Sequence, residues 1–259
     1  MRIAVDTRAL LPPLTGIGHF VHRLTDAMLP LLSPDESLLS FNGWRLEPIE
    51  GNFLARVEAV NASRSVKIVG LSVRRASKKA YIALRQITPV RRGVRMMQAR
   101  CFQRAEKHFD IFHAVNYVPP GAFRKPVLPF IHDLSHIRYP QAHPKERVEW
   151  LETQLQLIAA APIVQTNSQF SKSEIVATLG IAAERIYVTY AAPGSQFRPE
   201  RDGDDPVLAK HQLSAGKYFL VVGTREPRKN IKTVADAYTK LSAAMQARLP
   251  LIWAGPPGW

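Results

Sequence analysis

The amino-acid sequence predicts an α/β protein built on a parallel, doubly wound sheet with helices on both faces. Short apolar runs rich in β-branched residues alternate along the chain with stretches in which apolar residues recur at helical spacing. This alternation is typical of βαβ units, in which a helix connects two parallel strands. A cluster of Pro, Gly and Asp residues at Ala192–Leu213 interrupts the pattern, and strand and helix signals resume after it.

The elements predicted before this interruption follow one another along the chain. The predicted strands are Arg2–Ala9, Leu38–Trp44, Val66–Leu71, Ile111–Val115, Val127–Ile131, Ile163–Thr166 and Ile186–Tyr190. The predicted helices include His19–Leu32, Lys145–Ala160 and Ser171–Leu179. Ser171 and Glu174 have the spacing of a capping box, which marks the start of the last of these helices.

The chain after the interruption contains fewer elements. We expect a strand at Tyr218–Val222, a helix at Ile231–Met245 and a strand at Leu249–Ala254. About 45 residues follow the interruption, which is fewer than an ordinary independent domain contains. The sequence therefore predicts a first domain at residues 1–195, a linker at 196–213 and an incomplete second domain at 214–259.

Composition and motifs exclude several classes of protein. A single cysteine, Cys101, cannot form an internal disulfide, which indicates a reducing compartment. No apolar run approaches the roughly 20 residues that a membrane-spanning helix needs, and the first strand carries Asp6 where a signal peptide would be apolar. The sequence has no Walker A motif, no His-Glu-x-x-His and no Gly-x-Ser-x-Gly, so we expect neither a metal site nor acyl-transfer chemistry.

The net charge of +14 is concentrated in one segment. Between Arg74 and Lys107 there are eleven Lys and Arg residues and one acid, Glu106. Apolar residues are interleaved with them, which predicts two amphipathic helices broken at Pro89. Three interpretations stay open: a solvated basic face over a packed helix, a surface for anionic lipid head groups, and a nucleic-acid-binding surface.

A turn with two cations follows the strand Tyr218–Val222. It reads Gly-Thr-Arg-Glu-Pro-Arg-Lys-Asn from Gly223 to Asn230 and leads directly into a predicted helix. Glycine lets a ligand approach the backbone, the N–H groups at a helix start point outward, and Arg228 and Lys229 add full positive charge. The turn therefore predicts a phosphate site, and its alternative is an ordinary helix start with two solvated cations.

Two further groups of residues lie at predicted strand ends, the edge where ligands of open α/β sheets bind. Gly16 and Gly18 follow the first strand, but Val21 replaces the third glycine of a dinucleotide fingerprint, so an NAD site is poorly supported and a tight turn is the alternative. His132 and Asp133 end the strand Val127–Ile131, where histidine could donate to a sugar hydroxyl or phosphate. A structural histidine is the alternative.

A collinear series of motifs resembles a known family. The motifs are Asp6-Thr7-Arg8, Thr15-Gly16-Ile17-Gly18, Phe112-His113, Asn116-Tyr117, Ile131-His132-Asp133-Leu134, Tyr139-Pro140, Thr166-Asn167-Ser168, Phe170-Ser171, Tyr190-Ala191-Ala192-Pro193-Gly194, Phe197-Arg198-Pro199 and the turn from Gly223 to Asn230. In this order they resemble the retaining glycosyltransferases of family 4. That family has the GT-B fold, two Rossmann-like domains that face each other across a cleft.

The resemblance implies a function and assigns residues to it. The family transfers a hexose, with mannose as the first candidate, from a nucleotide diphosphate sugar to a saccharide or lipid-linked acceptor, and needs neither metal nor cofactor. The implied catalytic residues are His132 and Lys229. The implied donor-binding residues are Gly16, Gly18, Gly223, Thr224, Arg228 and Lys229, and those on the acceptor side are Asn116 and Asp133. The first domain would bind the acceptor. The protein would lie in the cytoplasm or at the inner face of the plasma membrane, where residues 74–107 would contact anionic lipid.

The sequence departs from the family in one respect. The Glu-x₇-Glu pair that contacts the donor in the second domain has no counterpart after Gly223, and Glu50 and Glu58, which share its spacing, fall in the first domain. We therefore expect residues 1–259 alone not to transfer sugar. The alternatives are a non-catalytic remnant that acts as a binding or membrane-surface module and, third, a nucleic-acid-binding protein.

Overall fold

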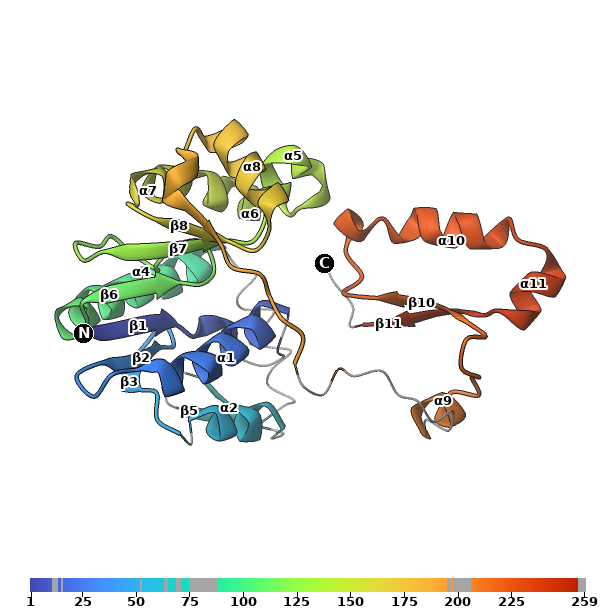
Figure 1. Ribbon diagram of the computed structural model, residues 1–259, viewed down its shortest axis with the longest axis horizontal. Coiled ribbons are helices and arrows are strands. Elements are labelled where there is room, and N and C mark those ends of the chain that lie inside the picture. The colour runs from blue at the N-terminus through green and yellow to red at the C-terminus, as the bar shows by residue number, and fades with distance from the viewer. Residues whose placement is uncertain are drawn as a thin grey trace. The chain divides into compact units, whose positions relative to one another are not determined.

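The computed structural model describes residues 1–10, 14, 16–51, 53–62, 65–68, 71–74, 88–194, 197 and 206–255 (Figure 1). The chain forms two compact units. One contains residues 1–134 and 154–192, and the other contains residues 135–153 and 193–259. The domain limits predicted at 195 and 213 remain predictions.

A seven-stranded sheet forms the centre of the first unit, with the strand order β3-β2-β1-β6-β7-β8-β9. Its strands are β1 (Arg2–Asp6), β2 (Ser37–Phe41), β3 (Leu46–Pro48), β6 (Ile111–Ala114), β7 (Val127–Ile131), β8 (Val164–Thr166) and β9 (Ile186–Val188). Neighbouring strands pair in parallel, except for β2 and β3, which pair antiparallel. The predicted α/β class with a mostly parallel sheet is confirmed.

Apolar side chains on the two faces of the sheet form separate clusters, because successive residues of a strand point to opposite faces. Ala4 of β1 belongs to a cluster with Phe102 of α4 (Thr88–Ala105), whereas the next residue, Val5, belongs to a cluster with Val21 of α1 (Gly16–Met28). Helices therefore cover both faces of the sheet, as a doubly wound fold requires.

The other described elements of the first unit are short. They are η1 (Arg8–Leu10), η2 (Leu29–Leu31), α2 (Phe53–Ala62), the antiparallel hairpin β4 (Ser65–Ile68) and β5 (Leu71–Arg74), η3 (Glu106–His108), α7 (Leu155–Ala160), α8 (Gln169–Leu179) and η5 (Ala183–Arg185). The predicted strand Val66–Leu71 thus overlaps both strands of this hairpin, and residues 69–70 lie outside the described part.

The second unit contains a pair of parallel strands, β10 (Phe219–Val222) and β11 (Leu251–Ala254). Its other elements are α5 (Ser135–Arg138), η4 (Pro140–Ala142), α6 (Lys145–Glu152), α9 (Pro206–Lys210), η6 (Pro227–Lys229), α10 (Ile231–Thr239) and α11 (Ala243–Arg248). The interval predicted as a linker therefore includes one helix, α9. Apolar side chains of β10 are exposed, Val222 by 73% and Leu220 by 51%, as expected for a sheet with few strands to cover it.

Several helix limits differ from the prediction, each for a local reason. The start of α8 is capped by Ser168, whose side chain accepts a hydrogen bond from the backbone N–H of Ser171, so the predicted capping box at Ser171 was wrong. Pro89 is the second residue of α4, where its missing N–H costs nothing. It therefore lies in the first turn of a helix, and the helix expected before it falls at residues 75–87, outside the described part.

Two predicted helices are each divided in the structure. Lys145–Ala160 forms α6 and α7, which are separated at residues 153–154. Ile231–Met245 forms α10 and the first part of α11, because Ser242 caps a new helix by accepting a hydrogen bond from the backbone of Met245. Apolar spacing continues across both breaks, so periodicity alone could not locate them.

The order of strands places a topological switch point at the carboxyl ends of β1 and β6. The chain runs from β1 outward to β2 and later returns to the other side of β1 as β6. The connections that leave these two strands diverge, which opens a crevice in folds of this kind. The residues that follow β1, β6 and β7 are therefore placed for ligand binding.

His113 of β6 is a buried titratable residue at this part of the sheet. It pairs in register with Val5 of β1 and Leu128 of β7, and its Nε2 atom has no hydrogen-bond partner in the described part of the chain. Burial lowers the pKa of His113 from 6.5 to about 4, against the opposing effects of a hydrogen bond with Gln165 and of the Asp6 charge.

This lowered pKa predicts a loss of stability in mild acid. Below pH 6.5 the unfolded chain protonates His113, whereas the folded chain does so below about pH 4. From pH 7 to pH 5 this difference costs about 2 kcal/mol of unfolding free energy. Urea unfolding should show that His113→Gln loses about 2 kcal/mol less than the parent chain over this pH range. Equal losses would contradict the prediction.

Candidate functional site

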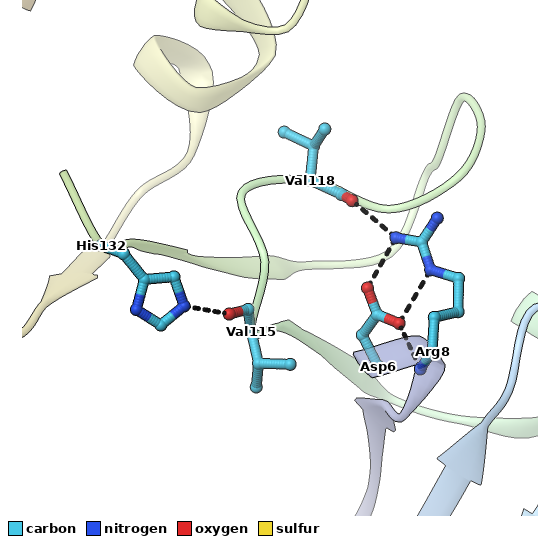
Figure 2. Close-up of polar contacts among 5 residues, drawn as sticks. All are labelled: Asp6, Arg8, Val115, Val118 and His132. Atoms are coloured by element: carbon cyan, nitrogen blue, oxygen red, sulfur yellow. Dashed lines mark hydrogen bonds and ion pairs between the residues drawn. The ribbon is translucent and has the colours of Figure 1, made fainter. Parts of the chain in front are cut away.

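An ion pair lies at the carboxyl end of β1. Asp6 is the last residue of the strand and is buried, and Arg8 donates from Nε to Asp6 Oδ1 at 2.8 Å and from Nη2 to Asp6 Oδ2 at 2.6 Å. The same Nη2 atom also donates to the carbonyl oxygen of Val118, 3.1 Å away, in the loop after β6 (Figure 2). Arg8 therefore connects the end of β1 to the loop that follows its neighbouring strand.

Charge and hydrogen bonding together keep Arg8 ionised. Burial disfavours the guanidinium, but the charge of Asp6 and its hydrogen bonds outweigh this effect and raise the pKa of Arg8 above its ordinary value. Such a bidentate pair is among the stronger contacts available to an arginine.

His132 follows β7 and is held in one orientation. Its Nε2 atom lies 2.8 Å from the carbonyl oxygen of Val115, so the imidazole donates from this nitrogen (Figure 2). Its ring meets Phe20 of α1 edge-on, with centroids 5.7 Å apart, and lies 4.7 Å from the ring of Phe130. His132 therefore packs between α1 and β7 as well as facing the strand ends.

The environment of His132 keeps the ring neutral. Burial lowers its pKa below the ordinary value, and the hydrogen bond to Val115 and the charge of Asp133 oppose this effect without reversing it. In a neutral imidazole that donates from Nε2, Nδ1 carries the lone pair and is the acceptor. The ring can therefore accept a hydrogen bond from a hydroxyl group.

The loop after β6 supplies the remaining predicted residues of this edge. Asn116 is half-buried, and Tyr117 has a φ of 69°, a left-handed conformation that is uncommon outside glycine. Tyr117 donates from its hydroxyl to the carbonyl oxygen of Asp133 at 2.8 Å. The structure therefore brings Asn116, His132 and Asp133 to one edge of the sheet, together with Arg8 and Tyr117, which were not predicted as site residues.

Gly16 and Gly18 have different surroundings, although both lie in the first turn of α1. Gly16 is exposed, and a Cβ atom there would meet nothing within 4 Å. At Gly18 a Cβ would lie 2.5 Å from the carbonyl oxygen of Ala9 and 2.7 Å from Leu14 Cδ2. Close packing thus requires glycine at position 18, and Gly16 leaves the helix start open.

The turn after β10 shows that its two cations differ. Arg228 donates from Nε to Oε2 of Glu226 at 2.6 Å, and Glu226 is buried. Lys229 has no ion pair among the described residues, and its Cε atom lies 4.0 Å from the place where a Cβ of Gly223 would be. Thr224 follows Gly223 and is half-buried. The two cations, Thr224 and Gly223 therefore share one short turn, as predicted.

The helix α10 begins directly beyond these cations. Asn230 has a φ of 50° and precedes the first helical residue, so the chain turns sharply from η6 into α10. The first backbone N–H groups of a helix have no partner within it and attract anions. The turn thus combines a fixed arginine, a lysine that has no ion pair within the described part of the chain, and a helix N-terminus.

Gly255 and Glu226 are residues of this turn region that the sequence analysis missed. Gly255 follows β11 as Gly223 follows β10, and their φ angles are 159° and 143°. A Cβ at Gly255 would lie 2.0 Å from the carbonyl oxygen of Gly223. The signals were present in the sequence, since Gly255 ends an apolar run and Glu226 stands two residues before Arg228.

The described residues offer neither a metal site nor a membrane-spanning helix. They contain no group of three or more His, Cys, Asp or Glu side chains placed to hold a metal ion. Among the helices that the structure describes, none has both the length and the apolar character needed to cross a bilayer.

Comparison with known proteins gives two matches. The family model of Glycosyltransferase Family 4 matches residues 41–192, which is more than half of the chain. The whole chain is 31% identical to O-antigen chain mannosyltransferase B of Escherichia coli. The match covers 65% of the length of that relative.

The two glycines of α1 give a matched pair of substitutions. Gly18→Ala should lower the free energy of unfolding by about 1–3 kcal/mol, because the new methyl group collides with the backbone of Ala9. Gly16→Ala adds the same group in open space and should change stability by less than about 0.5 kcal/mol. Denaturant unfolding measures the free energy of unfolding of both variants. Equal changes would show that the backbone around Gly18 shifts to accommodate the methyl group, which would contradict the prediction.

Proposed function

The chain belongs to glycosyltransferase family 4, and on that basis we propose that it forms the acceptor side and part of the donor side of a retaining, metal-independent hexosyltransferase. The strand architecture described above is that of the family's GT-B fold, with a Rossmann-like first unit and part of a second Rossmann-like sheet. The donor in this proposal is a nucleotide diphosphate sugar, and the acceptor is a saccharide or a lipid-linked saccharide.

The cationic turn after β10 is the observation that carries the proposal. Transfer of a sugar from a nucleotide diphosphate leaves negative charge on the departing diphosphate, which fixed cations and helix N-terminal N–H groups stabilise. Glu226 engages Nε of Arg228, so the other two nitrogens of the guanidinium are the ones we assign to phosphate oxygens. Lys229, which we assign a catalytic role, would neutralise the leaving group.

The glycines at the strand ends favour a close approach of the diphosphate to the backbone. Gly223 and Gly255 end adjacent parallel strands and carry no side chain. Thr224 adds a hydroxyl next to Gly223. In the first unit we assign Gly16 to the donor as well, because its exposed position at the start of α1 leaves the backbone N–H groups there accessible.

We assign His132 to the reacting sugar. The neutral ring presents Nδ1 as an acceptor, which suits a sugar hydroxyl, and the contacts with Val115, Phe20 and Phe130 fix its direction. Asn116 and Asp133 lie in the loops beside it and would bind hydroxyl groups of the acceptor. Gly18 packs against the backbone of Ala9. We therefore assign it an indirect contribution to the donor site, because this packing fixes the position of the first turn of α1.

Mannose is the sugar that we propose, because the Escherichia coli relative is named as an O-antigen chain mannosyltransferase. The same name favours a saccharide chain as acceptor and a place in polysaccharide synthesis. The match covers 65% of that relative, so these assignments extend from a partial alignment to this chain.

The exposed face of α4 fits an anionic membrane surface. Its described part exposes Arg92, Arg100 and Arg104, and between them Met96 and Met97 are exposed by 57% and 51%. Exposed arginines together with apolar side chains on one face of a helix are the composition that binds anionic head groups and enters the interface. We propose that this face brings the enzyme to a lipid-linked acceptor at the inner membrane surface. Residues 75–87 of the basic segment lie outside the described part.

A non-catalytic binding module is the second candidate function. The exposed apolar side chains of β10, among them Leu220 and Val222, would favour this candidate if residues 1–259 act alone. An assay of mannose transfer separates the enzyme from the binding module. It supplies labelled nucleotide diphosphate mannose to a version of the protein with a complete second domain. Transfer supports the enzyme, and its absence with intact nucleotide binding supports the module.

A charge-removal pair tests the donor site in the same version. Lys229→Ala should weaken nucleoside diphosphate binding by about 1.5–3 kcal/mol, or roughly ten- to a hundredfold, because one charge-assisted contact is lost. Lys232→Ala is the control, because it also removes one positive charge. The side chain of Lys232 is exposed on α10 and pairs with Asp236, so its loss should have little effect on nucleoside diphosphate binding. Calorimetric titration with GDP and UDP measures both. Unchanged affinity in Lys229→Ala would remove Lys229 from the site.

The membrane proposal predicts a dependence on both charge and apolar contact. Arg92→Gln/Arg100→Gln should reduce partition onto vesicles containing phosphatidylglycerol by about 2 kcal/mol, or roughly thirtyfold. Met96→Gln/Met97→Gln should also reduce it, and Lys210→Gln/Lys217→Gln in the second unit should not. Cosedimentation with neutral and anionic vesicles measures these effects. Equal losses in the two variants that remove positive charge, with no loss in Met96→Gln/Met97→Gln, would indicate a response to total charge alone and contradict the proposal.

A further inference from the structure

We infer that Arg8 is a positioning residue, which fixes the direction of the His132 ring through the loop at residues 115–118. This inference rests on the proposed role of His132 and adds a residue to it. Arg8 lies after β1 and His132 after β7, and β6 lies between those two strands in the sheet. The loop that follows β6 is therefore the connection between them.

Arg8 is itself held in place by Asp6 and by packing against Gly43. Asp6, which is 1% exposed, accepts hydrogen bonds from the side chain of Arg8 and, at 3.1 Å, from its backbone N–H. The aliphatic part of Arg8 runs past Gly43, where a Cβ would lie 3.3 Å from Cδ of Arg8. A side chain with these contacts has little freedom to turn away, so its Nη2 atom is a fixed donor for the carbonyl oxygen of Val118.

The loop that receives this hydrogen bond is short and tightly bent. Val115 N–H donates to the carbonyl of His113, and Val118 N–H donates to the carbonyl of Asn116, each at 3.1 Å. Between them Tyr117 has its left-handed φ of 69°, a conformation that is energetically unfavourable outside glycine. A strained loop of this kind keeps its shape where surrounding contacts enforce it.

The enforcing contacts come from both neighbouring strands. From β7, Phe130 accepts a hydrogen bond from the backbone of Tyr117 at 3.1 Å, and His132 donates to the carbonyl of Val115 at 2.8 Å. From β1, the contact is that of Arg8 with Val118. The carbonyl groups at the two ends of the loop are thus each held by a side chain, as Figure 2 shows.

Loss of Arg8 would release one end of the loop. The carbonyl of Val118 would lose its charged donor, and because Val118 is 1% exposed, a buried acceptor without a partner favours rearrangement of the loop. The carbonyl of Val115, three residues away, would then lose its fixed direction. His132 would keep its packing against Phe20 and Phe130 but not its single hydrogen-bonded orientation.

The alternative role for Arg8 is direct contact with a substrate. Its Nε and Nη2 atoms are engaged by Asp6 and Val118, so a ligand would meet the remaining nitrogen, Nη1. A ligand-free measurement separates the two roles, because a residue that acts through contact with substrate has no effect on His132 before the substrate arrives.

The experiment follows the Nε2 proton of His132 by NMR in residues 1–259 labelled with ¹⁵N-histidine and free of ligand. The signal is assigned by its disappearance in His132→Gln. A hydrogen-bonded imidazole proton exchanges slowly with water, and in Arg8→Met we expect its exchange to be at least tenfold faster. Arg8→Lys keeps the charge but has a shorter side chain and lacks the second nitrogen that Asp6 engages, so it should give an intermediate rate and serves if Arg8→Met does not fold.

Arg2→Met is the matched control. Arg2 is the first residue of β1 and pairs with Asp110, with 3.0 Å between Nη2 and Oδ1, so it is an arginine–carboxylate pair at the opposite end of the same strand. It should leave the exchange rate of the His132 proton unchanged. Unchanged exchange in folded Arg8→Met or Arg8→Lys would overturn the inference. The measurement uses neither a sugar donor nor a transfer assay. Its result therefore does not depend on whether the proposed function is correct.

Discussion

The position of β1 between β2 and β6 is the constraint on which the first unit depends. Parallel pairing on both sides fixes the register of Val5 against Ser40 and His113, and it sends Ala4 and Val5 into separate apolar clusters. The same pairing brings the ends of β1, β6 and β7 to one edge. Arg8 and His132 come from distant parts of the chain, and their shared loop exists because these three strands are neighbours in the sheet.

The sequence was sufficient for the class of fold and for placing the candidate site residues at strand ends, because both follow from apolar runs and from the residues that come directly after them. It was not sufficient for the state of those residues. The direction of His132 depends on a carbonyl group of Val115, a backbone atom that carries no sequence signal, and on the left-handed φ of Tyr117. The prediction of the start of α8 failed for a similar reason. Ser168 and Ser171 can both cap a helix by residue type, and the extended backbone of Ser168 makes it the cap in the structure.

The two cations of the turn show how tertiary contacts separate residues that look alike in sequence. Arg228 and Lys229 are adjacent, and either could pair with Glu226 by spacing alone. The 3₁₀ turn of η6 directs Arg228 toward the buried carboxylate and Lys229 toward Gly223. Arg228 is thereby oriented before any ligand is present, whereas Lys229 has no ion pair among the described residues. This difference suits the roles in recognition and charge neutralisation that we propose for the two residues.

The contact between Gly223 and Gly255 limits how such a site can evolve. A side chain at Gly255 would collide with the backbone of Gly223, and a side chain at Gly223 would have to adopt a φ of 143°. Neither obstacle depends on which sugar or base is bound, so these two positions are fixed by the protein's own backbone whatever the donor. In the donor site that we propose, divergence toward a new donor would therefore proceed through neighbours with side chains, such as Thr224, while Gly223 and Gly255 stay the same.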